Sequence, residues 1–471
     1  MITGFGGIGA LGRCSELRPG RRQSPIAAGI GRRYFPGGDH ADREPAGHGY
    51  RGVNALLRRA GWNLIDQVLS AATNAALSFL VARTVDARGF GAFAAGFLIF
   101  TLVIGVGRAL VGQPLSIRYS AAEPDERRQA VARGLGTVIA VTVPVAVLCA
   151  VAALLLGGIL RPTLLAFALV LPALVVQDTC RLAFFADGRP DLATLNDAVW
   201  AVVQFAGVGA LIATGHATAW SLALAWGASA AVCAVLGVAQ LHVRPRVSAA
   251  GEWIGEHRGL VGYLVADFLL GAGALQGGIL LIGAFVGIDN LGSLRAAQVL
   301  TGPLLVLFAA ATAFGLPEVS KRAATLSAAR LQQVAVAVTG LMLTTAFVYV
   351  GVVLLIPDSL GLALLGDTWS GASAVLLPLS LVAAFSGGCL GPVIVILALG
   401  QSKATFRLTA IEAVMVLTAM LIGARAGGAT GAAWGLCVQQ FILIPLWFLQ
   451  MRAILRTHGE AVPTPTAVAT P

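Results

Sequence analysis

The sequence predicts an all-α polytopic membrane protein with about twelve transmembrane helices in two six-helix lobes. Its 471 residues are 57% hydrophobic and only 11% charged, whereas an average soluble domain is about 25% charged. Its mean hydropathy is +0.83. Apolar runs long enough to cross a bilayer recur along the chain from residue 53 onward, and arginines recur between them.

Residues 1–52 are rich in Gly, Arg and Pro and predict a disordered cytoplasmic tail, or an extension that is not part of the native protein. Gly4, Gly6 and Gly9 have the spacing of a dinucleotide-binding loop. No strand pattern precedes them and no helical pattern follows them, so the sequence does not support that interpretation.

The apolar runs predict the individual spans, because a membrane helix needs roughly 20 apolar residues. The predicted spans are 63–84, 90–113, 134–157, 162–185, 193–213, 217–241, 259–285, 290–315, 331–356, 372–399, 405–424 and 428–450. Gly427, Gly431 and Gly435 recur every four residues, a spacing that favours close packing against another helix.

Alternate connections between the spans are basic. Arginine and lysine are enriched around 118–133, 181–189, 244–258, 321–330 and 403–407, and are sparse in the intervening turns. Because cytoplasmic loops carry an excess of Arg and Lys, this distribution predicts that both termini are cytoplasmic. The net charge of +10 is therefore attributed to membrane orientation and not to nucleic-acid binding.

A basic segment divides the chain into two halves. We expect lobes at 53–241 and 259–450, a cytoplasmic linker at 242–258 and a cytoplasmic C-terminal tail at 451–471. A shift of 201 residues aligns Asp66 with Asp267 and Gly91 with Gly292, with the same hydropathy register around them. Since each half has an even number of spans, the halves are parallel repeats related by an axis along the membrane normal.

The first span carries a polar stripe in an otherwise apolar helix. At about 100° per residue, one arc holds Asn63, Asp66, Gln67, Ser70, Thr73, Asn74 and Ser78. A charged residue at the centre of the bilayer costs at least about 2.5–3.5 kcal/mol, so this stripe must face protein or water. It lines a cavity or provides hydrogen bonds between helices.

Other spans carry similar groups. Span five has Asn196, Asp197, Trp200 and Gln204 on about one face, and Thr405, Thr409 and Glu412 share a face of span eleven.

Arginines also lie at the edges of two spans. Arg108 lies inside the cytoplasmic end of span two, where it either faces a cavity or extends its side chain to the interface. Asp178 and Arg181 are three residues apart at the end of span four, a spacing at which they can form an ion pair on the helix.

Several classes of site are disfavoured. The six cysteines contain no CxxC pair and the six histidines lie outside the apolar runs, so we expect no metal site, no disulfide framework and no cofactor. No connection after residue 53 is large enough for a soluble catalytic domain, so we expect a protein that is not an enzyme.

Four stretches together resemble the polysaccharide biosynthesis flippases, the O-antigen and teichoic-acid exporters of the multidrug/oligosaccharidyl-lipid/polysaccharide superfamily. They are RAGWNLIDQVLSAATNAALSFLVARTVDARGFGAFA, GRALVGQPLSIRYS, QDTCRLAFFADGRPDLATLNDAVW and GPVIVILALGQSK. The resemblance covers about residues 53–456. It implies a MATE/flippase-like fold in the bacterial inner membrane that moves a polyprenyl-diphosphate-linked glycan outward by alternating access, next to membrane lipids and glycan polymerase or assembly proteins.

The resemblance and the polar positions together give a hypothesis for the site. Arg108 and Arg181 attract the diphosphate, and sugar contacts come from Asn74, Asn196, Trp200 and Gln204. Asp66, Asp267 or Glu412 binds a coupling proton or sodium ion, which biases the two lobe arrangements only if it binds them with different affinity.

Three other functions fit parts of the same pattern. A cation-coupled drug or metabolite antiporter of the same superfamily would need a compact ion site in one lobe, which Asp66 with Asn196 and Asp197 could form. A membrane-embedded enzyme would need a larger outer loop. A non-transporting scaffold of a glycan-assembly complex would need neither.

Overall fold

The computed structural model describes the backbone of residues 48–323 and 325–460, which is helical apart from short turns. The tail predicted at 1–52 therefore lies almost wholly outside the described residues. The helices are His48–Thr84 (α1), Ala87–Gly107 (α2), Gln113–Arg118 (α3), Pro124–Leu154 (α4), Leu160–Ala186 (α5), Pro190–Ala213 (α6), Ala219–Leu241 (α7), Ala250–Phe268 (α8), Ala274–Val286 (α9), Ile288–Arg322 (α10), Ala328–Leu354 (α11), Asp358–Leu365 (α12), Trp369–Gly388 (α13), Leu390–Ala398 (α14) and Ser402–Glu460 (α15).

Twelve membrane crossings follow from these helices, as the sequence predicts. The described residues contain 11 helical segments that are long and apolar enough to span a bilayer. One of them, α15, has non-helical backbone angles at Gly427 and Gly428, which divide it into two crossings. Gly428 has a φ of 61°, a left-handed conformation that glycine adopts without a steric cost.

Two spans contain a turn of π-helix. Arg108–Gly112 (η2) joins α2 to α3, and Leu269–Gly273 (η4) joins α8 to α9. A π-turn inserts an extra residue into the α-helical hydrogen-bond pattern and rotates the side chains that follow it. The first π-turn begins at Arg108, one of the sequence-predicted site residues.

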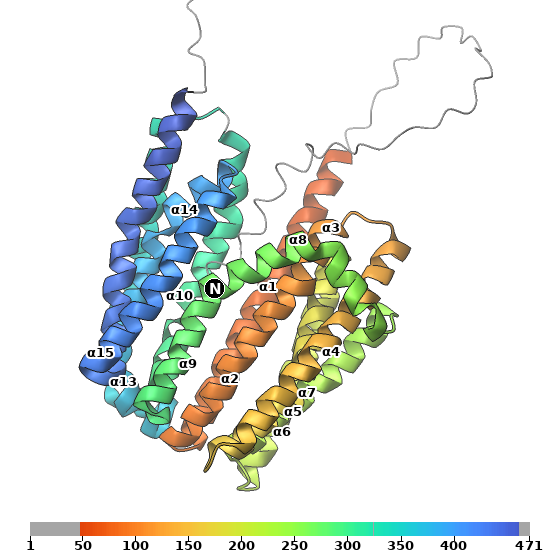
Figure 1. Ribbon diagram of the computed structural model, residues 1–471, viewed down its shortest axis with the longest axis vertical. Coiled ribbons are helices and arrows are strands. Elements are labelled where there is room, and N and C mark those ends of the chain that lie inside the picture. The colour runs from red at the N-terminus through yellow and green to blue at the C-terminus, as the bar shows by residue number, and fades with distance from the viewer. Residues whose placement is uncertain (1–47, 324, 461–471) are drawn as a thin grey trace, which may run out of the picture.

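The helices form two lobes (Figure 1). Helices α1–α7 pack in one lobe, where α5 contacts α4 and α7, and helices α9–α15 pack in the other, where α13 contacts α10 and α15. The α1–α2 turn and the α9–α10 turn lie at the same end of the bundle, opposite the C-terminal end of α15. We call this the α1–α2 end.

The segment predicted as a linker is folded against the first lobe. Helix α8 begins at Ala250, inside the predicted linker 242–258. The indole Nε1 of Trp253 donates to the carbonyl oxygen of Leu110 in the first π-turn at 3.0 Å. Glu256 pairs with Arg133 of α4 at 2.8 Å, and His257 Nε2 lies 3.2 Å from the Tyr119 hydroxyl oxygen. The start of α8 is therefore attached to the N-terminal lobe.

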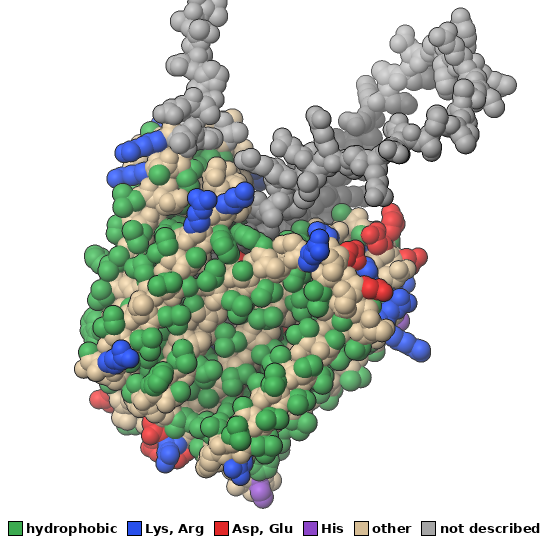
Figure 2. Space-filling view, viewed as in Figure 1, with side chains coloured by type: hydrophobic (Ala, Val, Ile, Leu, Met, Phe, Trp, Pro, Cys, Tyr) green, Lys and Arg blue, Asp and Glu red, His purple; other side chains and the backbone are tan. Residues whose placement is uncertain are grey.

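The surface is that of a protein dissolved in lipid. Large apolar side chains are exposed on the bundle, including Leu148 at 68%, Val235 at 72% and Phe285 at 75% of their surface. Figure 2 shows hydrophobic side chains covering the visible face, with charged side chains gathered toward the two ends. Exposed apolar area on this scale is unfavourable in water and favourable in a bilayer.

The two halves of α15 cross through small residues. A Cβ atom at Gly431 would lie 2.1 Å from the carbonyl oxygen of Gly423, and one at Gly435 would lie 2.3 Å from that of Ala419. Only glycine allows this approach. Gly427, the first residue of the predicted glycine stripe, instead lies in the kink.

Replacing Gly431 by Val should therefore destabilise the protein by at least about 1–3 kcal/mol, the usual cost of overpacking. Thermal unfolding in detergent measures the effect. Gly340→Val is the matched control, because no atom lies within 4 Å of a Cβ placed there. Equal melting temperatures for the two variants would contradict the packing argument.

Candidate functional site

A buried arginine organises the polar interior of the N-terminal lobe. Arg181 lies near the end of α5 with only 7% of its side chain exposed. Its Nε donates to Asp66 of α1 at 2.8 Å and its Nη2 is also bonded to Asp66. Asp197 of α6 lies 3.3 Å from Arg181 Nε, and Asp178, one turn earlier on α5, lies 3.8 Å from Nη1. One guanidinium thus connects α1, α5 and α6.

A second arginine extends this cluster toward the surface. Arg108 binds the carboxylate of Asp178 with both sides of its guanidinium, Nε to Oδ2 at 2.8 Å and Nη2 to Oδ1 at 2.6 Å. Its side chain is 38% exposed. The planar, two-bonded geometry is the strong form of this interaction. Arg108 is therefore held by a carboxylate of the same lobe.

The formal charge of the cluster is negative. Asp66, Asp178 and Asp197 carry three carboxylates against the two guanidiniums of Arg108 and Arg181. When all five groups are ionised, one negative charge is left over. The Oδ1 atom of Asp66 is buried and has no hydrogen-bond partner among the described residues. A proton or a monovalent cation would neutralise this excess and satisfy that oxygen.

Amide side chains hold the carboxylates in place. Gln177 Nε2 donates to Asp197 Oδ1 at 2.9 Å and to Asn196 Oδ1 at 3.2 Å. Asn196 Nδ2 donates to the carbonyl oxygen of Cys233 on α7 at 3.0 Å. Asn196, predicted from the sequence to contact sugars, thus has both ends of its amide engaged within the lobe, and Gln177 is a member that the sequence analysis missed.

A polar crevice opens beside this cluster. It is lined by Ser70, Thr73, Asn74, Asp197, Trp200 and Gln204, and its volume of about 10 Å³ holds about one water molecule. Gln204 Nε2 is buried without a hydrogen-bond partner among the described residues. Trp200 is oriented by its Nε1, which donates to Ser229 Oγ at 3.1 Å. The structure thus brings together the predicted residues Asn74, Trp200 and Gln204 with Asp197.

The other two predicted ion-coupling residues lie elsewhere. Asp267 is buried on α8 and Glu412 is partly buried on α15. Neither residue contacts the cluster around Arg181, whose described members lie on α1, α5, α6 and the first π-turn. Within the part of the chain that the structure describes, neither carboxylate has an ion pair or a hydrogen bond.

Arg295 is a charged group that the sequence analysis missed. It lies on α10, about two turns from the start of the helix at Ile288, and is partly buried. Its guanidinium carbon is 4.3 Å from the centre of the Phe97 ring of α2, in the other lobe. No ion pair or hydrogen bond to this guanidinium exists among the described residues, so a cation–π contact across the lobe interface is its only described stabilising interaction.

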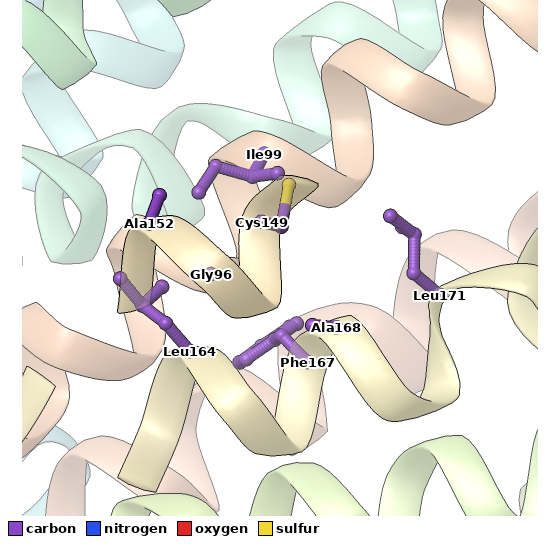
Figure 3. Close-up of a pocket in the computed structure, with 8 residues that line it drawn as sticks. All are labelled: Gly96, Ile99, Cys149, Ala152, Leu164, Phe167, Ala168 and Leu171. Carbon is purple, nitrogen blue, oxygen red and sulfur yellow. The ribbon is translucent and has the colours of Figure 1, made fainter. Parts of the chain in front are cut away.

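A second cavity, of about 90 Å³, has an entirely apolar lining (Figure 3). It lies between α2, α4 and α5, and its side chains present only carbon and the sulfur of Cys149 to the space. With no polar group to fix a ligand's orientation, it fits the methylene groups of a lipid chain better than a sugar or an ion. No cluster of three His, Cys, Asp or Glu side chains able to hold a metal occurs in the described residues.

The fold is that of known transporters of the MOP superfamily. A multidrug resistance MATE transporter of that superfamily in its inward-facing conformation superposes with a TM-score of 0.65 at 14% identity, over 84% of this chain and 96% of that one. The lipid II flippase MurJ, in an inward closed conformation, matches with a TM-score of 0.62 at 11% identity, over 86% and 91%. A MOP superfamily transporter from Pyrococcus furiosus matches with a TM-score of 0.55 at 14% identity, over 86% and 96%. Neither a family model nor a curated protein matches the sequence.

The cluster around Arg181 gives a stability prediction. Arg181→Met should destabilise the protein by about 3–5 kcal/mol, because it leaves buried carboxylates without a counter-charge. Adding Asp66→Asn to that variant should recover part of the loss, since it removes one of them. Thermal unfolding of the two single variants and the double variant measures the coupling. Arg330→Met, at an exposed position, is the control. Strictly additive effects would show that Arg181 and Asp66 do not stabilise each other.

Proposed function

We propose that this protein is an alternating-access transporter that flips a polyprenyl-diphosphate-linked oligosaccharide or polysaccharide precursor across the bacterial inner membrane. The shared fold with MATE transporters and MurJ supports the transporter class. The arginine distribution supports cytoplasmic termini, which makes the α1–α2 end the outer end. The proposed partners are membrane lipids and glycan polymerase or assembly proteins.

The observation that carries the proposal is the guanidinium of Arg295 between the lobes, which has no ion pair among the described residues. A cation in the membrane region without a counter-ion is costly and is usually functional. A diphosphate that entered between the lobes would supply that counter-ion, and Arg can bind two phosphate oxygens at once. Arg108 and Arg181, which the sequence predicts as diphosphate contacts, are already neutralised by three carboxylates.

The polar crevice supplies the chemistry for sugars. Asn74 and Gln204 offer amide groups, and Trp200 offers an aromatic face beside them. In the described arrangement the space is far too small for a saccharide, so we infer that glycan binding requires the helices around it to separate. The apolar cavity between α2, α4 and α5 is suited to part of the lipid chain.

The excess negative charge of the cluster around Arg181 suits it for coupling. Uptake of one proton or sodium ion by Asp66 and Asp197 would neutralise the cluster and change how firmly Arg181 holds α1 to α6. Asp267 and Glu412 are alternative coupling carboxylates in the rest of the bundle, since neither has a counter-ion among the described residues.

A cation-coupled drug or metabolite antiporter is the second candidate function. The negative cluster in the N-terminal lobe favours it, and so does the likeness to MATE transporters. The unpaired Arg295 argues against a cationic drug as substrate, because it would repel that substrate at the lobe interface.

Arg295→Ala should reduce transport of the lipid-linked glycan by about ten- to a hundredfold, the value of a hydrogen-bonded contact to a charged group. Arg295→Lys should retain part of the activity because it keeps the positive charge. The measurement is the appearance of the lipid-linked intermediate at the outer leaflet of membrane vesicles at matched protein levels. Arg452→Ala, at an exposed position, is the control. Normal transport by Arg295→Ala would refute a role for this residue in substrate binding.

Coupling is tested with three conservative variants, Asp66→Asn, Asp267→Asn and Glu412→Gln. We expect Asp66→Asn to abolish the dependence of transport on a proton or sodium gradient while leaving downhill exchange of substrate in place, because it removes the excess negative charge of the cluster. Transport in vesicles with imposed gradients distinguishes the two ions. If Asp66→Asn keeps the gradient dependence and Glu412→Gln or Asp267→Asn loses it, coupling lies outside the cluster.

A further inference from the structure

The two lobes meet through glycine at the α1–α2 end. A Cβ atom on Gly91 of α2 would lie 2.1 Å from the carbonyl oxygen of Ile288, the first residue of α10. A Cβ atom on Gly292 of α10 would lie 3.1 Å from the amide nitrogen of Gly91 and 3.2 Å from the carbonyl oxygen of Ala87. Both glycines are buried. The backbones of α2 and α10 therefore come into direct contact here.

These two glycines are related by the internal repeat. The shift of 201 residues that aligns Asp66 with Asp267 also aligns Gly91 with Gly292. Positions related by a two-fold rotation can touch only if they lie near the rotation axis. The contact therefore marks where the pseudo-two-fold axis passes between the lobes, and a path between the lobes at this end must pass this point.

The polar contacts that flank the glycines are few and solvent-exposed, and buried apolar side chains such as Phe90 and Leu291 pack beside the glycines. Arg83 Nη1 donates to the carbonyl oxygen of Ala363 on α12 at 3.0 Å. Arg88 and Asp289 form an exposed ion pair at 4.0 Å, a geometry that contributes little to stability. The closure of this end therefore depends on close packing of backbone and apolar side chains, and the attraction between packed atoms falls steeply when the helices separate by a few ångströms.

We infer that the crossing of Gly91 and Gly292 is the gate at the α1–α2 end of the transport path. It shuts by direct backbone contact on the pseudo-two-fold axis, and a side chain at either glycine holds it open. Arg295 lies about one turn further along α10 from Gly292, so a shut gate separates the Arg295 guanidinium from that side of the membrane. This inference concerns access between the lobes and is independent of which substrate is moved.

The test measures access to a cysteine at Gln298, about one turn beyond Arg295 on α10, in a protein whose six native cysteines are replaced by alanine or serine. A membrane-impermeant maleimide is applied from the α1–α2 side of oriented vesicles. Gly91→Leu should raise the labelling rate by at least about tenfold, corresponding to a tenfold larger population of open molecules. Gly292→Ala should raise it less, because its nearest neighbours would need to move by only a few tenths of an ångström.

Gly340→Leu is the matched control, since a Cβ atom there meets nothing within 4 Å. Labelling from the α1–α2 side at the same rate in Gly91→Leu and Gly340→Leu, with both inserted at normal levels, would overturn the inference. A second experiment does not require a side chain at the crossing. Arg88→Cys and Asp289→Cys are combined, and the two cysteines are joined by a short, cleavable bifunctional thiol reagent. The cross-link should abolish both the labelling of a separately tagged probe at position 298 and the transport of any substrate. Cleaving the cross-link should restore both.

Cross-linked protein that transports at the normal rate would also overturn the inference, and this arm decides the question if Gly91→Leu fails to fold. Because labelling of position 298 involves no substrate, its outcome does not depend on the proposed flippase function. Normal gating in a protein that transports no lipid-linked glycan would refute the proposed function and leave the gate in place.

Discussion

The arrangement of the N-terminal lobe depends on the pairing of the charges buried inside it. Arg181 pairs with Asp66 and Asp197, and Arg108 pairs with Asp178. These contacts join α1 and the first π-turn to α5 and α6, which lie far from them in sequence. Because an unpaired buried charge costs several kcal/mol, the four segments are held in one arrangement more firmly than apolar packing alone would hold them in lipid. The crevice beside Asp197 exists because these helices are fixed around that cluster.

The charges of the two lobes are arranged for different tasks. In the cluster around Arg181 the carboxylates outnumber the guanidiniums, so this cluster is suited to holding a cation or a proton. At the lobe interface a single guanidinium rests on Phe97 without a carboxylate partner, so it is suited to an anion. The attachment of α8 to the N-terminal lobe through Trp253 and Glu256 means that movement of the lobes relative to each other must be taken up further along this segment, where the second π-turn lies.

The fold was predictable from the sequence because a membrane helix is defined by a local property, the length of an apolar run. The division of the long C-terminal helix at Gly427 and Gly428 was also predictable from its length. The site was only partly predictable. The polar stripe of span one identified Asp66 and Asn74, and the spacing of Asp178 and Arg181 predicted their ion pair. The pairing of Arg181 with Asp66 and Asp197 was not predictable, because those carboxylates come from other helices. Arg295 carries no helical-face pattern, since it is a single charge in an apolar run, and so it was missed.

The sequence by itself determined the number of spans and the presence of polar groups where lipid does not tolerate them, and it predicts the direction of the spans from the distribution of arginine and a two-fold repeat. These features follow from composition and periodicity along one helix at a time. Only the tertiary structure decided which charges neutralise each other, which arginine is left without a partner, and that the repeat-related residues Gly91 and Gly292 touch. Pairing between side chains and contact between backbones depend on distances between helices, which hydropathy and helical periodicity do not encode.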